Sequence, residues 1–267
     1  MLLYLLLGIN NTESKDTMKE QHNTSGESPS NKLNGRVPAR SFFYKAAVFV
    51  DGDFFIRRLK KLNPDIVNDP KLVAQRLFKA SWKHAFRLNR ELYRIFFYDC
   101  SPFERNLHYP LSNHCINFKK SEVYKFRTQL HAELRKTRKC ALRLGKIVLD
   151  QNTKWLLKDS SLQALIKKEK SFEDLKDEDF IPNLRQKQVD MKIGVDITTL
   201  ALQKRIDTII LISGDSDFAP AAKLARVEGI DFILDPMRCD HIQDDLFEHV
   251  DGIHSVFVKQ DITEDSE

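Results

Sequence analysis

The sequence predicts an α/β fold in which helices cover both faces of a mostly parallel sheet. Short apolar runs such as residues 46–50 and 209–212 are typical of strands that are buried on both faces. Stretches with helical spacing alternate with these runs along the chain. Strands that alternate with helices pair in parallel through right-handed crossovers, so the alternation predicts the sheet type as well as its helical cover.

The elements are expected in an alternating order. The strands are predicted at residues 46–50, 91–99, 207–213, 230–235 and 252–258. The helices are predicted at residues 70–89, 189–205, 218–228 and 241–250. Residues 41–258 would together form the folded domain.

Local signals support these helices. Asp69 before Pro70 combines a cap residue with a proline in the first turn, which favours a helix start. Gly229 has the usual position of a left-handed C-cap, and Asp240 is predicted to cap the last helix. The residues expected to face inward are Leu72, Leu77, Ala80 and Trp82 on the first helix and Ile193, Ile197, Leu200 and Ala201 on the second.

The segments at the two ends and in the middle of the chain do not follow this alternation of strands and helices. Residues 10–40 are polar, residues 1–40 are predicted to form a disordered leader, and residues 259–267 form an acidic tail. The opening apolar run is shorter than the roughly 20 residues that span a bilayer, and nothing later reaches that length, so no membrane partner is expected. Residues 101–186 predict a basic, partly helical insertion with a hairpin over "KIVLDQNTKWLLKD".

The cysteines bear on the cellular compartment. Cys100, Cys115, Cys140 and Cys239 show neither a CxxC pair nor regular spacing. A disulfide framework or a zinc ribbon is therefore not expected, and a cytoplasmic location is. The sequence leaves open whether the chain forms a homo-oligomer.

Several aspartates are expected to meet at one edge of the sheet. Asp51, Asp99 and Asp215 each follow an apolar strand directly. The carboxyl ends of parallel strands meet at one edge, where α/β sheets bind their ligands. Grouped carboxylates repel one another unless a cation lies among them, and all-oxygen ligation suits Mg²⁺ or Mn²⁺ rather than zinc.

The other acidic candidates have weaker support. The side chain of Asp53 points to the same face of the sheet as that of Asp51 only if the strand continues to residue 53. Asp99 fits a role in capping the following segment equally well. Asp190 falls in the first turn of a helix, and Asp196 lies about 120° around that helix from it, so the two should not share a face. Asp217 is expected to divide its role between the metal and the cap of the next helix.

Three stretches carry a family resemblance. "AVFVDGDFF", "RQKQVDMKIGVDITTLAL" and "TIILISGDSDFAPAAKLARVEGIDFIL" resemble, in that order, the NYN domain of the PIN-like group that includes LabA-type proteins. The resemblance covers about residues 45–257 and implies a three-layer αβα PIN-like fold with a metal-dependent ribonuclease centre. It further implies that the metal carboxylates, and so the catalytic residues, are Asp51, Asp190, Asp215 and Asp217. Phe54 departs from the pattern, because the family commonly has Asn there.

A basic stretch indicates the substrate class. Residues 119–146 carry ten Lys or Arg against Glu122 and Glu133, and such a surplus attracts a polyanion. Tyr124, Phe126 and His131 are candidates for stacking on unpaired bases. The same helix face also fits simple packing on the core through Leu130 and Leu134. The predicted contacts to single-stranded RNA are Lys119, Lys120, Lys125, Arg127, Arg135, Lys136, Arg138, Lys139, Arg143, Ser213 and Ser216.

Three functions fit these observations. The first is an endoribonuclease in which the metal activates water for in-line attack on phosphorus. The second, from the D-x-D in "VFVDGDFF", is a phosphatase of the haloacid-dehalogenase type with Asp51 as nucleophile, but Phe55 and the tight "SGDSD" spacing depart from that pattern. The third, which Phe54 favours, is a non-catalytic RNA-binding module that has kept a metal site.

Overall fold

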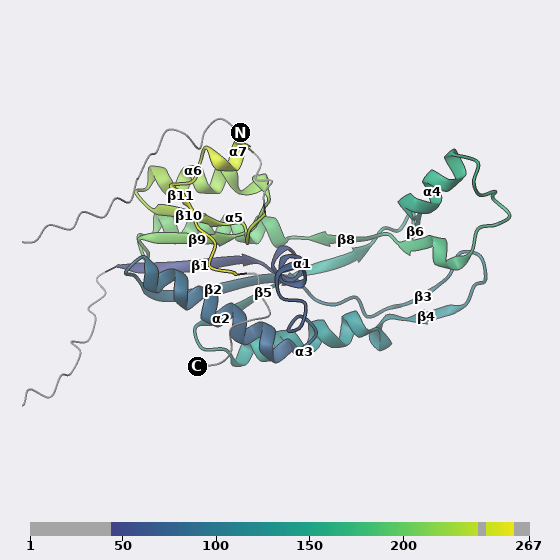
Figure 1. Cartoon of the computed structure of the whole chain (residues 1–267), viewed down its shortest axis with the longest axis horizontal. Coiled ribbons are helices and arrows are strands. Elements are labelled where there is room, and N and C mark those ends of the chain that lie inside the picture. Colours follow the sequence, from purple (N-terminus) through teal and green to yellow (C-terminus); the bar gives the residue numbers. More distant parts are fainter. Residues whose placement is uncertain (1–43, 240–243, 259–267) are drawn as a thin grey trace, which may run out of the picture. The chain divides into compact units, whose positions relative to one another are not determined.

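The computed structural model of the chain is shown in Figure 1 and describes residues 44–239 and 244–258. The predicted leader, the acidic tail and the Asp240 cap lie outside the described residues. In the described part, the main sheet has seven strands in the order β11-β10-β9-β1-β2-β5-β8. Their bounds are β1 Lys45–Asp51, β2 Glu91–Cys100, β5 Cys140–Leu149, β8 Leu184–Lys187, β9 Thr208–Ile212, β10 Asp231–Asp235 and β11 Gly252–Ile253. Every neighbouring pair is parallel except β5 with β8, which confirms the predicted sheet.

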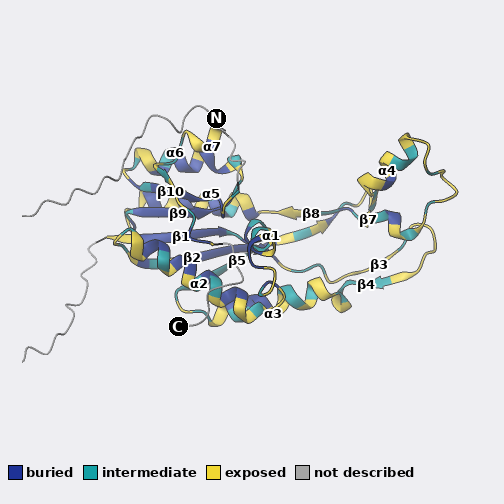
Figure 2. Ribbon diagram, in the orientation of Figure 1, coloured by how far each residue is buried: buried dark blue, intermediate teal, exposed yellow. Residues whose placement is uncertain are grey.

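Helices cover both faces of this sheet, as a three-layer αβα fold requires. The first face packs against α1 Gly52–Leu62, α2 Pro70–Arg87 and α3 Glu122–Lys136, and the second against α5 Val189–Leu202, α6 Ala219–Val227 and the short α7 Asp244–Phe247. Successive side chains of β1 alternate between these two cores, because side chains in a strand point to opposite faces. Figure 2 accordingly shows β9 buried along its length and β1 buried between its two end residues.

The predicted helices α2, α5 and α6 are confirmed, but two residues of α2 that were predicted to face inward are exposed. Asp69 caps α2 by accepting hydrogen bonds from the backbone N–H groups of Lys71 and Leu72 at 2.8 and 3.2 Å. The four inward residues predicted for α5 are all buried. On α2 the inward stripe passes through Leu77 and Ala80, and the prediction for Leu72 and Trp82 is wrong: these side chains are 40% and 52% exposed.

Two boundaries differ from the sequence expectation. The first strand ends at Asp51, and helix α1, which the sequence pattern did not predict, begins at Gly52. The last strand is confined to Gly252–Ile253, because only these residues pair with β10. Helix α6 ends as predicted, with Gly229 at a φ of +81° in the left-handed region.

The middle segment contributes to the main sheet and also has strand pairs of its own. The predicted hairpin is wrong: β5 pairs in parallel with β2 and antiparallel with β8. The physical reason is that residues 146–149, the first half of the expected hairpin, pair with residues 184–187, whereas residues 155–157 pair with residues 180–182. The segment's other elements are β3 Asn106–His108 paired with β4 Cys115–Asn117, β6 Trp155–Leu157 paired with β7 Phe180–Pro182, the helix α4 Asp159–Ile166 and the 3₁₀ turns η1 Phe118–Lys120 and η2 Asp177–Asp179.

None of the described helices combines the length and apolarity that crossing a membrane requires.

Candidate metal centre

The direction in which the sheet grows reverses at β1. The chain leaves β1 to build β2 on one side, and β9 pairs later with the other side. Open α/β sheets bind ligands at such a switch point, beyond the carboxyl ends of the strands. Val50 of β1 lies opposite Ile212 of β9, so the residues that follow them, Asp51 and Ser213, lie side by side at this edge.

Asp51 ends β1 and caps α1. Its Oδ1 accepts hydrogen bonds from the backbone N–H groups of Asp53 and Phe54, both at 3.1 Å. The chain turns at Gly52, where a Cβ atom would lie 2.5 Å from the backbone oxygen of Tyr98, so only glycine fits. The motif "DGD" therefore serves the turn from strand to helix, and it fixes the Asp51 carboxylate at the switch point.

Asp215 and Asp217 lie in the loop between β9 and α6. Asp215 caps η3, the 3₁₀ turn Ser216–Phe218, by accepting a hydrogen bond from the backbone N–H of Asp217 at 3.0 Å. The capping role expected for Asp217 thus belongs to Asp215. Ser213 is buried, and its hydroxyl accepts a hydrogen bond from the backbone N–H of Asp215 at 3.2 Å. Ser213 therefore holds the loop in shape, and both carboxylates are exposed.

The loop that carries Asp215 packs against the start of α1. A Cβ atom on Gly214 would lie 2.7 Å from Cε2 of Phe54. Phe54, the residue that replaces the family's Asn, therefore covers Gly214 and ties the loop after β9 to the loop after β1. This contact helps to set the spacing between Asp51 and Asp215.

Asp190 joins the same group from α5. It lies in the first turn of that helix, directly after Val189, and is itself exposed. The residue before the helix, Gln188, has a φ of +75°. This is a left-handed backbone conformation, which residues other than glycine rarely adopt. Asp51, Asp190, Asp215 and Asp217, called the open cluster below, thus come from three separate elements.

The open cluster is electrostatically unbalanced. Burial, reinforced by the charges of Asp53 and Asp190, raises the pKa of Asp51 from 3.8 to about 6, although the hydrogen bond from Phe54 opposes this. Partial burial, followed by the charges of Asp215 and Asp217, raises the pKa of Asp190. Asp190, Asp215 and Asp217 form no ion pair with any residue in the described part of the chain. A cation added here would relieve this repulsion.

The donor set fits a divalent cation in an open arrangement. Within residues 44–239 and 244–258, no three His, Cys, Asp or Glu side chains converge as a ready-made metal site. Mg²⁺ does not require such a cage, because it usually binds one or two carboxylates and completes its shell with water and substrate phosphates. The four carboxylates of the open cluster, three of which have no ion-pair partner among the described residues, supply the chemistry for that mode of binding.

Asp99 lies at the same edge in a contrasting environment. Its Oδ2 accepts hydrogen bonds from Nη1 of Arg127 at 2.7 Å and pairs with Nε2 of His131 at 2.8 Å. Burial alone would raise the pKa of Asp99, but His131 and Arg127 outweigh it and hold that pKa below its ordinary value. Arg127 also donates to Asp53 at 3.0 Å. These four residues, Asp53, Asp99, Arg127 and His131, are called the paired cluster below.

The paired cluster changes the roles expected for its members. Because the strand ends at Asp51, Asp53 does not share its strand facing, and it lies between Arg127 and the exposed Arg57 at 3.0 and 3.2 Å. His131 is 3% exposed, so the prediction that it stacks on bases is wrong. Arg127, predicted to contact RNA, is committed to two carboxylates. The spacing i, i+4 on one helix was the sequence signal that Arg127 and His131 share a face.

Asp196 and most of the predicted RNA contacts are also engaged within the chain. Asp196 accepts hydrogen bonds from the hydroxyl of Tyr98 at 2.8 Å and from Nε of Arg143 at 3.2 Å, and it does not join Asp190 in the open cluster. Further ion pairs join Lys119 to Glu104, Lys125 to Glu122, Lys136 to Glu133 and Lys139 to Glu91. Lys120, Arg135 and Arg138 pair with no carboxylate among the described residues.

The basic residues are divided between the two edges of the sheet. Helix α3 carries them over 15 residues, or about 22 Å. Arg127, in its first half, reaches the carboxyl edge at Asp99, whereas Lys139, just beyond its end, reaches Glu91 at the start of β2. Lys119, Lys120 and Lys125 thus lie with Arg127 toward the carboxyl edge, and Arg143, opposite Tyr98 on β2, lies near that edge as well. Ser216 is half-buried in η3, next to Asp215.

Comparison with known proteins adds the family to this geometry. The family model named "NYN domain" matches residues 105–255. The chain belongs to the NYN domain family. The matched part of this NYN domain contains Asp190, Asp215 and Asp217, and β1 with Asp51 precedes it.

Solved structures give only distant similarity. A protein of unknown function, VPA0982 from Vibrio parahaemolyticus RIMD 2210633, is 14% identical, with a TM-score of 0.42 over 80% of this chain and 93% of that one. UGT73P12 from Glycyrrhiza uralensis, complexed with glycyrrhetinic acid 3-O-monoglucuronide, is 13% identical, with a TM-score of 0.27 over 72% of this chain and 28% of that one. No curated protein matches the chain.

Proposed function

We propose that this NYN domain is a metal-dependent endoribonuclease that hydrolyses phosphodiester bonds in single-stranded RNA. The observation that supports it is the open cluster: four carboxylates from three elements lie near enough to one another at the switch point of the sheet for their charges to add to the raised pKa values of Asp51 and Asp190, and no cation of the described chain forms an ion pair with Asp190, Asp215 or Asp217. Membership of the NYN domain family makes a nuclease-like hydrolase the natural class for such a cluster.

The residues proposed to hold the ion are Asp51, Asp190, Asp215 and Asp217, with Mg²⁺ or Mn²⁺ as the hard cations that carboxylates prefer. When bound, such an ion supplies Lewis acidity at a phosphate oxygen and a more acidic water. The chain's own contribution is to hold the carboxylates in place. The N–H groups of Asp53 and Phe54 orient Asp51, and Ser213 fixes the backbone of Asp215.

The charges favour a nucleic acid as substrate, and the choice of RNA rests on the resemblance to the NYN family. Lys119, Lys120 and Lys125 lie at the end of the basic stretch that is nearer the carboxyl edge, and Lys120 pairs with no described carboxylate. Cations beside a carboxylate cluster attract the phosphate backbone and offset its repulsion by the aspartates.

Cys100, Cys115 and Cys140 are free thiols, which accords with a proposed cytoplasmic location.

The test is cleavage of a labelled single-stranded RNA in the presence of Mg²⁺ or Mn²⁺. Asp215→Asn is expected to reduce the rate at least 100-fold, because a lost carboxylate weakens charge stabilisation worth several kcal/mol. Asp207→Asn is the matched control, since Asp207 lies at the opposite edge and contacts only the backbone N–H of Lys45 through its side chain. Excess EDTA should abolish cleavage. Full activity of Asp215→Asn, or activity in EDTA, would refute the mechanism.

A second candidate is a non-catalytic RNA-binding module. The packing of Phe54 over Gly214 favours it, because an apolar ring stands where the family commonly has a polar amide. This candidate predicts RNA binding without cleavage under Mg²⁺ or Mn²⁺. Phe54→Asn should then leave the module inactive as well, whereas a gain of cleavage in that variant would show that the ring alone blocks catalysis.

A further inference from the structure

The C-terminal half of α2 carries an exposed aromatic face. Phe78, Trp82 and Phe86 are spaced i, i+4 and i+8, so they line one side of the helix. The rings of Trp82 and Phe86 stack with their centroids 4.9 Å apart and their planes at 19°. Trp82 remains 52% exposed and Phe86 41% exposed. Two stacked rings that keep so much apolar surface in water form a preorganised platform for a third flat ring.

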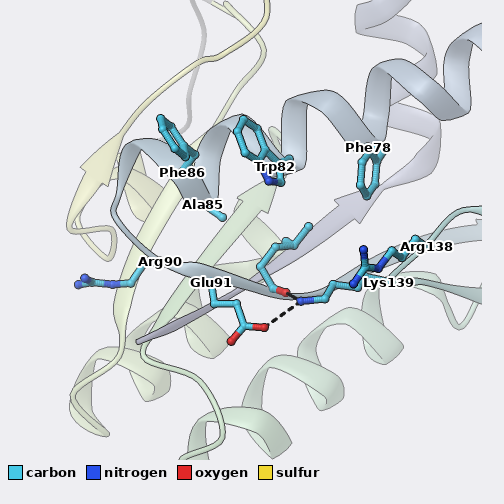
Figure 3. Close-up of a pocket in the computed structure, with 9 residues that line it drawn as sticks. Phe78, Trp82, Ala85, Phe86, Arg90, Glu91, Arg138 and Lys139 are labelled. Atoms are coloured by element: carbon cyan, nitrogen blue, oxygen red, sulfur yellow. Dashed lines mark hydrogen bonds and ion pairs between the residues drawn. The ribbon is translucent and has the colours of Figure 1, made fainter. Parts of the chain in front are cut away.

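Cations surround this platform. It borders a hollow of about 310 Å³ that Arg90, Glu91, Arg138 and Lys139 also line, as Figure 3 shows. Three cations face one carboxylate there. Lys139 is tied to Glu91 at 3.0 Å and to the backbone oxygen of Leu92, and Arg90 donates to Thr208 at 3.1 Å and lies over the ring of Tyr44. Arg138 has no hydrogen bond or ion pair with any described residue.

The hollow lies at the edge of the sheet opposite the open cluster. Glu91 begins β2 and Asp99 lies near its other end, so the two edges are roughly 26 Å apart at about 3.3 Å per residue. Arg138 and Lys139 belong to the basic stretch that was expected to serve the metal centre, and at this distance they cannot. Lys139 is already balanced by Glu91, so Arg138 is the cation here that is available to bind another ligand.

We propose that the Trp82–Phe86 platform binds a base of single-stranded RNA and that Arg138 binds its phosphate. This inference rests on the proposed RNA substrate and adds a second contact site, remote from the carboxylates. A nucleotide offers a flat π face and an anionic phosphate in one unit, which matches stacked rings flanked by cations. An acidic peptide would match the charges but need not offer a flat ring to stack on the indole of Trp82. The hollow is at the lower end of the size of small-ligand pockets, roughly 300–1,000 Å³, and so suits one base.

Fluorescence tests this site without reference to cleavage. In a Trp155→Phe background, Trp82 is the remaining tryptophan of the full chain. Titration with oligouridylate in EDTA should quench its emission to saturation, because a base stacks on the indole. The quench should persist in Asp215→Asn, weaken with rising salt, and be absent with double-stranded RNA, whose bases are already stacked.

Affinity measurements locate the contact. Trp82→Leu is expected to weaken binding of labelled oligouridylate at least 5-fold, the lower end of what base stacking contributes. The matched control is Phe172→Leu, at an aromatic residue that is 78% exposed elsewhere in the chain. Arg138→Glu should weaken binding as well, with Lys223→Glu on α6 as its control. Because Trp82 and Arg138 are exposed, their variants should melt within a few degrees of the wild type.

The length of the RNA provides a second readout. A strand long enough to reach both edges should show a raised KM and an unchanged kcat in Trp82→Leu, whereas a strand too short to reach the platform should show no change. RNA binding without quenching of Trp82, or equal losses in Trp82→Leu and Phe172→Leu, would overturn the platform and leave the proposed nuclease intact. Quenching by an acidic peptide, or by self-association at high protein concentration, would overturn RNA as the occupant.

Discussion

Two groups of carboxylates lie at the same edge of this sheet and have opposite electrostatic environments. In the paired cluster, buried Asp99 is held ionised by Arg127 and His131, and its pKa lies below the ordinary value. In the open cluster, Asp51 has a pKa raised to about 6, and Asp190, Asp215 and Asp217 have no described ion-pair partner. Position at a strand end therefore does not determine the role of a carboxylate; the presence or absence of an internal cation does.

The comparison indicates what each group is for. A carboxylate whose charge is already balanced inside the protein stabilises the fold and has little to offer an external ion. Carboxylates without an internal cation repel one another and so destabilise the folded state. Such repulsion persists in proteins chiefly where function requires it. The predictions below test this contrast, beginning with the largest expected effect.

The largest change in stability is expected when Arg127, the internal cation of the paired cluster, is removed. Arg127→Leu leaves Asp99 buried with His131 alone and is expected to destabilise the protein by about 3–5 kcal/mol at pH 7, measured by urea unfolding. Arg57→Leu is the matched control: it also removes a partner of Asp53, but Arg57 is 69% exposed and should contribute at most about 1 kcal/mol. Similar losses in the two variants would show that the paired cluster is not a buried network.

The pH dependence of this loss has a definite sign. The pKa of Asp99 is lower in the folded chain than in the unfolded one, so its stabilisation is present above pH 3.8 and is lost as the pH falls through the folded pKa. The difference between the wild type and Arg127→Leu should therefore shrink in acid.

The open cluster should respond in the opposite direction. Asp51→Asn is expected to stabilise the protein by about 2 kcal/mol at pH 7 in EDTA. The pKa change from 3.8 to about 6 sets an upper limit of about 3 kcal/mol, which partial solvent exposure reduces. Asn keeps the cap of α1, because its side-chain oxygen also accepts hydrogen bonds from backbone N–H groups.

The sign again follows from the pKa. Because folding raises the pKa of Asp51, the wild type is most stable relative to the variant below pH 3.8, and it loses that stability as the pH rises through about 6. Melting temperatures of the two proteins should therefore converge near pH 3.5 and separate by pH 7. Asp99→Asn is the control and should destabilise at pH 7. A loss of stability in both variants would mean that the two groups are alike.

The smallest effect concerns the packing that spaces the open cluster. Gly214→Ala places a Cβ atom 2.7 Å from the Phe54 ring, which the ring can relieve by leaving its rotamer at a cost of about 1 kcal/mol. A double-mutant cycle with Phe54→Ala measures the contact, since Gly214→Ala should cost nothing once the ring is gone. If the two changes are additive, Phe54 does not hold the loop after β9.

Several features of this protein follow from local sequence. Continuous apolar runs and helix caps predicted β1, β2, β9, β10, α2, α5 and α6, because strand burial, capping and helix periodicity depend on neighbouring residues. The same reasoning grouped Asp51 and Asp215 at one edge, because parallel strands end together. Family resemblance added Asp190, whose closeness to Asp215 and Asp217 appears in its raised pKa.

Other features depend on contacts that no local pattern encodes. β5 pairs with β2, about 45 residues earlier, and with β8, about 40 residues later, and the pairing with β8 excludes the expected hairpin. Trp82 faces outward because the inward stripe of α2 is set by the sheet beneath it.

The sequence by itself determined which residues can bind a cation: the aspartates at the strand ends and at the start of α5. Only the tertiary structure decided which of them are available to do so. Arg127 and His131, about 30 residues after Asp99 in the chain, fold back to balance its charge, and no comparable cation reaches Asp190, Asp215 or Asp217 within the described residues. The physical reason is that ionic balance depends on distances of a few ångströms, which folding sets and sequence spacing does not.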